Sequence, residues 1–300
     1  MKLPRVEAVK FLIVTADDFG LGEAVNLGVE RAAREGILTA ASLMVGAPGA
    51  ADAVRRAREL PDLSVGLHLV LADGCSVLPR REIPSLVDAD GRFGNHMVLD
   101  GVRFFALPAV RRQLEAEIRA QFRAFAATGL SLDHANAHKH FHLHPTLLEM
   151  LVRIGGEFGL RAVRLPREPA WAARRAGGAL AGLAVAGLLA PWLAVMRRRL
   201  RAARIAHNDT VFGISDSGSM DEPRLVEILG RLPDGVTELY LHPAVESGAA
   251  ISPAMRDYRH ADELAALTSP KVRAAIAACG AATGGFRSLS RVSGAERRAA

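Results

Sequence analysis

Short apolar runs alternate with amphipathic helical patterns along most of the chain. Brief runs rich in apolar residues are typical of buried strands, whereas apolar residues that recur every three or four positions are typical of helices packed on a core. Strands are expected at residues 11–15, 42–45, 64–70, 161–165 and 236–241, with a further short run near Leu132. Helices are expected at residues 22–35, 50–59, 111–128 and 222–232, and directly after Pro145. This alternation predicts an α/β fold with a mainly parallel sheet, in the form of an irregular or incomplete (β/α) TIM-like barrel.

Residues 71–95 interrupt this alternation because they are rich in turn residues and have little periodicity. Long irregular segments of this kind often lie over the ends of the strands and contribute to a binding site. We therefore expect a loop at this position, close to the functional residues.

Residues 170–206 form a second interruption, which we interpret as an apolar and basic insertion. No residue between 176 and 196 is charged, and arginines flank this stretch on both sides. Its length is that of a membrane span, about 20 residues, but its glycines, Pro191 and the arginines at both ends argue against a span. We expect a helical hairpin or an interfacial helix, with Trp192 in the acyl boundary and arginines at the lipid headgroups. A buried apolar helix or a contact in a homodimer is the alternative.

The charge distribution argues against a nucleic-acid partner. The chain of 300 residues has a net charge of +6, but residues 170–206 contain seven arginines and no acid, so the rest is close to neutral. A basic excess confined to residues 176–204 and beside an apolar run fits a membrane surface better than nucleic acid.

The remaining composition indicates one large intracellular domain. Half of the residues are apolar, which supports a sizeable core, and the two cysteines, Cys75 and Cys279, cannot build a disulfide framework. The N-terminal ten residues lack the apolar region of a secretory signal. We expect a single barrel domain over residues 1–288 with a tail at 289–300. The expected location is the cytoplasm, in peripheral association with the inner membrane.

Two adjacent carboxylates, Asp17 and Asp18, follow the first predicted strand. Active sites of barrels lie at the carboxyl ends of the strands. If the two side chains point to different sides of the turn, one can bind a metal ion while the other remains free as a general base. A helix cap or a solvated turn is the alternative.

Histidines provide the densest signal in the sequence. Five of the ten lie within eleven positions, at His134, His138, His140, His142 and His144, and His68 lies in another predicted strand. In an extended stretch, a spacing of two residues would line several imidazoles along one side, where they can bind a cation. The alternatives are a hydrogen-bonded core histidine at position 68 and surface metal affinity without function in the cluster.

An aspartate and two histidines from separate strand ends predict a three-ligand metal site with open positions, the arrangement of a hydrolytic site. His242 ends the predicted strand at 236–241 and can serve as a general acid, or simply cap the strand before Pro243.

These motifs together resemble the YdjC-like family of carbohydrate deacetylases, relatives of the NodB-type polysaccharide deacetylases. The resemblance extends through most of the chain. It rests on residues 16–20 (Ala-Asp-Asp-Phe-Gly), 66–68 (Gly-Leu-His), the histidine cluster with Pro145, Arg164, Arg167, 241–243 (Leu-His-Pro) and 259–270.

The resemblance implies that Asp18, His68 and His138 bind one divalent metal ion, that Asp17 is the catalytic base, and that His242 is a substrate-facing acid. The ligand types favour zinc, while magnesium remains an alternative.

Four further residues are candidates for contact with the substrate: Arg164, Arg167, His140 and Trp192. The two arginines could equally pair with acidic side chains.

The chain departs from the family pattern at two positions. Thr15 stands where the family usually has asparagine, and Asn136 stands where it usually has aspartate. The second departure removes a carboxylate that could bind or orient the metal site.

The apolar, arginine-flanked segment resembles the branch of the family associated with hopanoid biosynthesis. That resemblance implies N-deacetylation of N-acetylglucosaminyl bacteriohopanetetrol, a glycosylated hopanoid lipid. The alternatives are a deacetylase of soluble chito-oligosaccharides, a metal-dependent phosphoesterase and a non-enzymatic lipid-binding protein.

Overall fold

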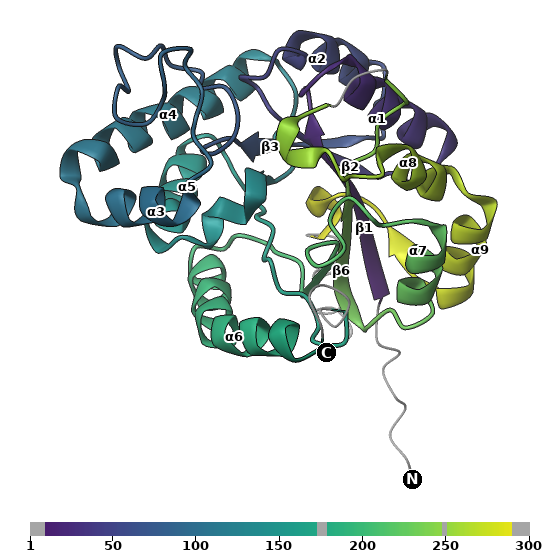
Figure 1. Ribbon diagram of the computed structural model, residues 1–300. Helices are drawn as coiled ribbons and strands as arrows, with labels where there is room; N and C mark the ends of the chain where they lie inside the picture. The colour runs from purple at the N-terminus through teal and green to yellow at the C-terminus, as the bar shows by residue number, and fades with distance from the viewer. Residues whose placement is uncertain (1–9, 173–178, 248–250, 290–300) are drawn as a thin grey trace.

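The computed structural model describes residues 10–172, 179–247 and 251–289 (Figure 1). The described residues form a seven-stranded sheet with the order β4-β3-β2-β1-β6-β5, and β7 pairs with β1; every strand pair is parallel. The strands are β1 (Lys10–Phe19), β2 (Ala40–Leu43), β3 (Ser64–Leu69), β4 (Ala135–Ala137), β5 (Thr210–Phe212), β6 (Gly235–Leu241) and β7 (Ala282–Thr283). This confirms the expected α/β class, with the parallel strands arranged as a half-barrel.

Helices connect successive strands and cover the sheet (Figure 1). They are α1 (Glu23–Glu35), α2 (Ala50–Arg58), α3 (Met97–Ala106), α4 (Pro108–Ala127), α5 (Pro145–Glu157), α6 (Ala179–Ala202), α7 (Glu222–Leu229), α8 (His260–Thr268) and α9 (Pro270–Cys279), with 3-10 turns η1 (His138–Leu143), η2 (Pro253–Met255) and η3 (Phe286–Ser288). The sequence pattern predicted α1, α2, α4, α5 and α7. It missed α3, α8 and α9, and also the short strands β5 and β7.

The central strand β1 explains why the fold places functional side chains at one end. Its apolar residues, from Phe11 to Val14, are buried on both faces. Leu12 and Val14 pack in the main core, whereas Phe11 and Ile13 pack in a second cluster with Phe286 on the inner side of the half-barrel. It pairs with β2 on one side and β6 on the other. The carboxyl ends of these strands therefore lie together at one edge of the sheet.

The prediction of a regular strand at residues 161–165 was wrong. Residues 162 and 163 make only isolated parallel bridges, Ala135 with Val163 and Ala162 with Ala206. The side chain of Asn208 continues the pairing, since it accepts a hydrogen bond from the amide of Leu165 and donates one to the carbonyl of the same residue. A side chain replaces part of the backbone ladder here, so the sheet is irregular between β4 and β5.

The long loop expected at residues 71–95 is present. Its chain is held by isolated antiparallel bridges between Cys75 and Arg92 and between Val87 and Phe93. The buried carboxylate of Glu117 on α4 accepts hydrogen bonds from the amides of Val77 and Leu78. The loop is thus tied to the domain by a side chain inside the core.

The hairpin expected in the apolar segment is not observed within residues 179–202, which form the single helix α6 with Pro191 inside it. Residues 176–178 lie outside the described part of the chain. Leu193, Met196 and Leu200 of α6 are buried against the domain. None of the helices in the described ranges combines the length and the hydropathy needed to cross a bilayer.

Candidate active site

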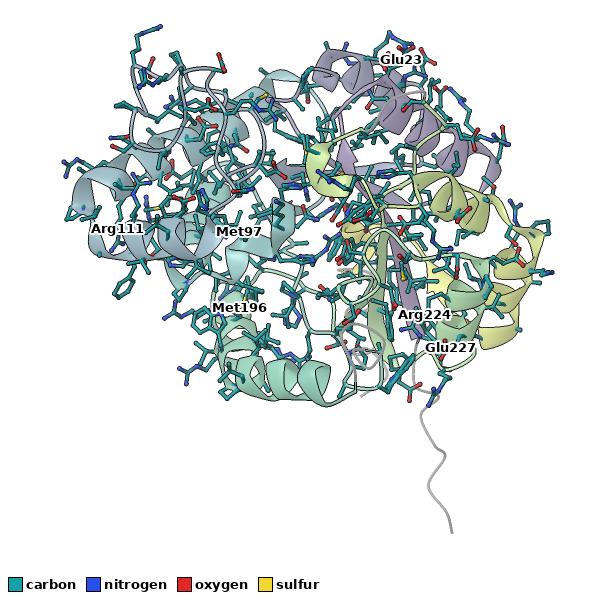
Figure 2. The ribbon with its side chains drawn as sticks, viewed as in Figure 1. Glu23, Met97, Arg111, Met196, Arg224 and Glu227 are labelled. Carbon is teal, nitrogen blue, oxygen red and sulfur yellow. The ribbon has the colours of Figure 1, made fainter. Side chains whose placement is uncertain are left out.

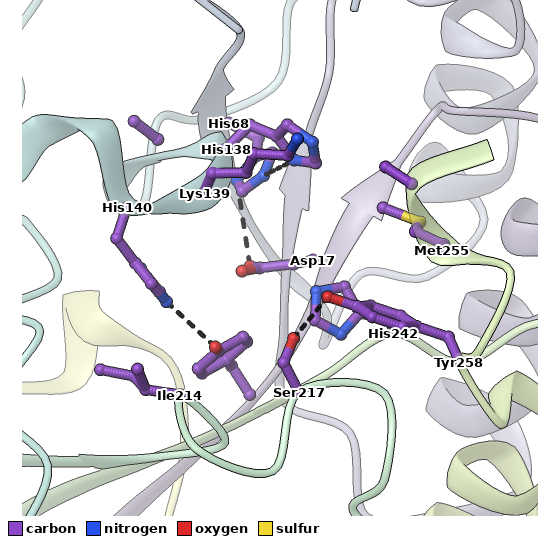
Figure 3. Close-up of a pocket in the computed structure, with 13 residues that line it drawn as sticks. Asp17, His68, His138, Lys139, His140, Ile214, Ser217, His242, Met255 and Tyr258 are labelled. Carbon is purple, nitrogen blue, oxygen red and sulfur yellow. Dashed lines mark hydrogen bonds and ion pairs between the residues drawn. The ribbon is translucent and has the colours of Figure 1, made fainter. Parts of the chain in front are cut away.

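The predicted site residues converge although they come from four strands. Asp17 and Asp18 end β1, His68 lies near the end of β3, His138 directly follows β4, and His242 directly follows β6. All are buried in the same region, and all except Asp18 line one pocket (Figure 3). The parallel topology makes this possible because it brings the carboxyl ends of the strands to the same edge.

A local irregularity separates the two adjacent carboxylates. The register of β1 against β2 shifts between Ala16 and Phe19, and Asp18 has a left-handed φ of 62°. A bulge of this kind redirects side chains that would otherwise alternate across the strand. Asp17 points toward Arg164 and Asn136, whereas Asp18 points toward His68 and His138. The expectation that the pair divides between two roles therefore agrees with the geometry.

Asp18, His68 and His138 present their ligand atoms to one point. Asp18 Oδ1 lies 3.2 Å from His68 Nε2 and 3.0 Å from His138 Nδ1, and the two imidazole nitrogens are 3.4 Å apart. The three ligand atoms lie within 4.8 Å of one another. Asp18 Oδ2 is buried and has no hydrogen-bond partner among the described residues. One carboxylate and two imidazoles form a donor set that suits zinc, and an unpartnered buried oxygen fits a cation site.

Asn136 connects this metal site to the candidate base. Its Oδ1 lies 2.6 Å from His68 Nδ1, and its Nδ2 donates to Asp17 Oδ1 at 3.2 Å and to Ser42 Oγ at 2.9 Å. An amide oxygen can only accept, so Nδ1 of His68 carries the proton and Nε2 is left free to bind a metal ion. An aspartate could orient His68 but, when ionised, could not donate to Asp17.

Ser42 is held in turn by His134, which sequence reasoning had grouped with the metal-binding candidates. His134 Nε2 lies 3.1 Å from Ser42 Oγ, and its Nδ1 lies 2.9 Å from Asp133 Oδ2. The imidazole stands directly against Gly66, where an added Cβ would come within 2.5 Å of the ring. Glycine in the Gly66-Leu67-His68 sequence is therefore required by the packing of His134.

Asp17 forms a buried ion pair with Arg164. Arg164 Nη1 and Nη2 donate to the two oxygens of Asp17 at 2.5 and 3.0 Å, and Nε and Nη2 donate to Glu238 at 2.9 and 2.8 Å. Burial alone would raise the pKa of Asp17, but the charges of Arg164 and His68 and the hydrogen bonds from Arg164 together outweigh it and hold the pKa well below its usual value. Asp17 is therefore ionised at neutral pH, as a proton acceptor must be.

This geometry decides between the two roles expected for Arg164. The side chain is fully buried, its donors face Asp17 and Glu238, and its guanidinium lies 4.5 Å above the ring of Tyr240. Arg164 positions the candidate base, and four of its five N–H groups donate to Asp17 and Glu238.

Arg167 and Trp192 do not lie in the pocket. Arg167 is exposed and donates to the carbonyl of Asp209. The indole N–H of Trp192 donates to the carbonyl of Leu143 at 2.7 Å, which attaches α6 to the end of η1. Both residues were candidates for contact with the substrate, but here both side chains make hydrogen bonds within the domain.

The expectation that the histidine cluster is extended was wrong. Residues 138–143 form the 3-10 turn η1, in which Lys139 and His140 both have left-handed φ angles of 54°. The imidazoles therefore point in different directions instead of lining one side. His140 Nε2 lies 3.0 Å from the hydroxyl of Tyr240, and His142 Nε2 lies 3.0 Å from the carbonyl of Arg164.

His140 keeps its expected place at the pocket, with its Nδ1 buried and unpartnered among the described residues. Burial, reinforced by the charge of Arg164, holds the pKa of His140 well below its usual value. It is consequently a neutral hydrogen-bonding group at pH 7, suited to contact with a sugar hydroxyl.

His242 lies across the pocket from Asp17. Its Nε2 is 3.9 Å from Asp18 Oδ2, and its Nδ1 is 3.9 Å from Glu263 Oε2. Burial lowers the pKa of His242 to about 4 and raises the pKa of Glu263 to about 7. Glu263 also accepts hydrogen bonds from the amides of His242 and Met220, so it fixes the end of β6.

Sequence reasoning missed three pocket residues with hydroxyl groups: Tyr240, Tyr258 and Ser217 (Figure 3). The hydroxyls of Tyr258 and Ser217 are 2.8 Å apart, and the rings of both tyrosines stand close to His242. Tyr240 precedes His242 by two residues, so the sequence could have predicted that both side chains lie on the same side of the strand. Tyr258 and Ser217 come from irregular segments, and no sequence pattern indicated them.

The comparisons with known proteins identify the family of this chain. The YdjC-like protein family matches residues 11–278 of the chain. A carbohydrate deacetylase of Geobacillus stearothermophilus is 30% identical over 270 residues, covering 89% of this chain and 93% of the relative. A carbohydrate deacetylase of Brevibacillus brevis is 42% identical over 158 residues, which is 52% of this chain and 59% of the relative.

Among solved structures, a protein of Enterococcus faecalis V583, provisionally described as a cellobiose-phosphate cleavage protein, matches with a TM-score of 0.70 at 24% identity. The match covers 94% of this chain and 99% of that protein, and it shows a shared fold. The chain therefore belongs to the YdjC-like family, and the expected enzyme class, a carbohydrate deacetylase, is confirmed.

Proposed function

We propose that this protein is a metal-dependent N-deacetylase whose substrate is N-acetylglucosaminyl bacteriohopanetetrol, with the free amine of the glucosaminyl lipid and acetate as products. The observation that carries the reaction class is the convergence of Asp18, His68 and His138 beside the ionised Asp17, at a pocket that Asp17 and both histidines line. Hydrolysis of an amide needs an activated water, a proton acceptor and an acid for the leaving nitrogen, and this pocket has residues for each task.

Asp18, His68 and His138 would hold the divalent cation, with zinc preferred for this donor set. A cation bound there polarises the acetyl carbonyl and lowers the pKa of a bound water. Asp17 accepts the proton that this water loses. Arg164 keeps Asp17 ionised and fixed, and Asn136 holds it in register with His68.

His242 is the proposed donor to the departing amine, because an amide nitrogen leaves poorly as an anion. Since burial lowers its pKa to about 4, the imidazole is neutral at pH 7 and must receive a proton during turnover. Glu263 lies 3.9 Å from Nδ1 and has a pKa raised to about 7, so it holds a proton in part of the molecules at neutral pH. We infer that this pair supplies the acid.

Two features support a sugar carried on a lipid. The pocket combines hydroxyl and imidazole groups with the apolar side chains of Ile214 and Met255. Helix α6 carries an uncharged first half and an arginine-rich last turn, a pattern typical of helices that rest on a membrane surface. The metal identity, the lipid and the peripheral membrane location are parts of this proposal.

The test is mass spectrometry of N-acetylglucosaminyl bacteriohopanetetrol incubated with the zinc-loaded protein and with the Asp17→Asn variant. We expect the wild type to remove one acetyl group. The variant should bind zinc normally and be slower by about 100- to 10,000-fold, the usual contribution of an acid–base group. An unchanged lipid together with deacetylation of a soluble chito-oligosaccharide would reject the lipid and retain the reaction. Cleavage of a phosphate ester without acetate release would reject the reaction class.

A further inference from the structure

Among the described residues, exposed apolar side chains gather on α3, a helix that the sequence pattern did not predict. Seven large apolar side chains are classed as exposed in the described part of the chain, and five of them lie between Val98 and Leu107. Val98 is 85% exposed and Phe105 is 68% exposed. Isolated exposed apolar residues are normal on soluble proteins, but a cluster of this kind indicates an interaction site.

Three of these side chains share one face of α3. At 100° per residue, Val98, Val102 and Phe105 lie within about 60° of one another around the helix axis. Phe104, about 100° or more from these three around the axis, is buried against the domain, and Gly101 is buried at the edge of this face. Helix α3 therefore has apolar side chains toward the core and also toward solvent. Packing within the domain does not explain why its outer face is apolar.

Helix α6 adjoins this surface. Gly101 of α3 packs against His144, where an added Cβ would come within 3.3 Å of the imidazole. Trp192 of α6 donates to the carbonyl of Leu143, the preceding residue. The two helices therefore flank the same turn at the end of η1. In the view of Figure 1, α3 and α6 lie on the same side of the molecule, and Figure 2 labels Met97 on α3 and Met196 on α6 in this region.

The nearby part of α6 adds apolar and positively charged groups. Leu188 lies one turn before Trp192 and is 81% exposed. Arg199 lies two turns after Trp192, and its guanidinium is 5.5 Å from the centre of the indole. Arg198, Arg199 and Arg201 are exposed, and α6 contains no acidic residue.

We propose that the outer face of α3, together with Leu188 and the exposed arginines of α6, docks the protein on an anionic lipid bilayer. Apolar side chains beside unneutralised arginines match the acyl boundary and the anionic headgroups of such a surface. Each arginine near the surface adds attraction, and the apolar side chains enter the interface. A second copy of the chain could cover the apolar side chains, but it would bring the same arginines into the contact.

The proposed docking surface lies beside η1, the turn that contains two candidate active-site residues. Turn η1 begins with the metal-ligand candidate His138, continues through the pocket residue His140, and ends at Leu143 against α6. Docking through α3 and α6 would hold that element close to the bilayer. The inference extends the proposed lipid substrate by naming the face through which the protein would reach it.

The test is sedimentation with vesicles made of equal parts of phosphatidylcholine and phosphatidylglycerol, without glycolipid. The Val102→Asp/Phe105→Asp variant should bind at least about tenfold more weakly than wild type, since it replaces two inserted apolar side chains with charges that anionic lipids repel. Arg199→Gln should bind about fivefold more weakly at low salt. Val226→Asp, which changes an exposed apolar residue on α7, is the matched control and should bind like wild type.

Three results would overturn the proposal. Wild type could fail to bind these vesicles, or the α3 variant could bind them as well as wild type. Analytical ultracentrifugation could show a wild-type dimer that the α3 variant converts to a monomer, which would make this face an interface between two copies. Circular dichroism and the Tm of the α3 variant should match wild type because the substituted side chains are exposed. Because the vesicles carry no substrate, loss of docking and failure of deacetylation are separate results.

Discussion

Replacing Arg164 with methionine tests the buried charge network that holds the candidate base. Methionine has a similar reach but no charge, so Arg164→Met removes four hydrogen bonds and leaves the carboxylates of Asp17 and Glu238 without their cation. Removing one partner of a buried ion pair typically costs about 3–5 kcal/mol. Because whole domains are stable by only about 5–15 kcal/mol, we expect a large fall in the free energy of unfolding.

The loss should depend on pH in a defined direction. In the wild type the pKa of Asp17 is lowered, so its contribution to stability is present above its unfolded value of 3.8 and is lost as the pH falls through the folded value. Without Arg164, burial would instead raise the pKa of Asp17, and its ionised form would destabilise the fold as the pH rises. The difference between wild type and variant should therefore be large at pH 8 and smaller at pH 5.

Urea denaturation followed by tryptophan fluorescence at both pH values measures this difference. Arg164→Met/Glu238→Gln should recover at least about 1 kcal/mol at pH 8, because one buried charge is removed, while remaining inactive. Arg119→Met breaks an exposed pair with Glu157 and should have little effect at either pH. A loss below about 1 kcal/mol for Arg164→Met, or an equal loss at the two pH values, would refute the reasoning.

Three further predictions concern the metal site and the attachment of α6. His138→Ala should lower zinc occupancy after dialysis, measured by elemental analysis; full occupancy would remove His138 from the ligand set. Asn136→Leu should weaken zinc binding by about 10- to 100-fold in a competition titration, because His68 loses the acceptor that orients it. Trp192→Phe should cost about 1 kcal/mol in urea denaturation through loss of the hydrogen bond to Leu143, with unchanged zinc affinity; an unchanged midpoint would contradict the role of that bond.

The two departures from the family pattern meet in one network. The hydroxyl of Thr15 donates to Glu238, which binds Arg164, and Arg164 binds Asp17, to which Asn136 also donates. Sequence reasoning treated Asn136 as the loss of a carboxylate and gave Thr15 no role. The structure gives each a hydrogen-bonding task around the base, so the departures are compatible with an intact site.

The sequence by itself determined the fold class, most of the strands and the metal-binding candidates. Buried parallel strands appear as uninterrupted apolar runs, and a strand-end location restricts Asp17, Asp18, His68 and His242 to one edge of the sheet. These patterns are local, so they can be recognised without knowing which distant residues these side chains contact.

Only the tertiary structure decided what surrounds these residues. The sequence could not show that residues 161–165 pair through the side chain of Asn208, or that η1 bends the histidine cluster away from an extended path. It could not assign Arg164 to Asp17, which lies 147 positions earlier, nor expose the outer face of α3. These features depend on contacts between distant segments, and a pattern of local periodicity contains no information about which distant side chains will meet.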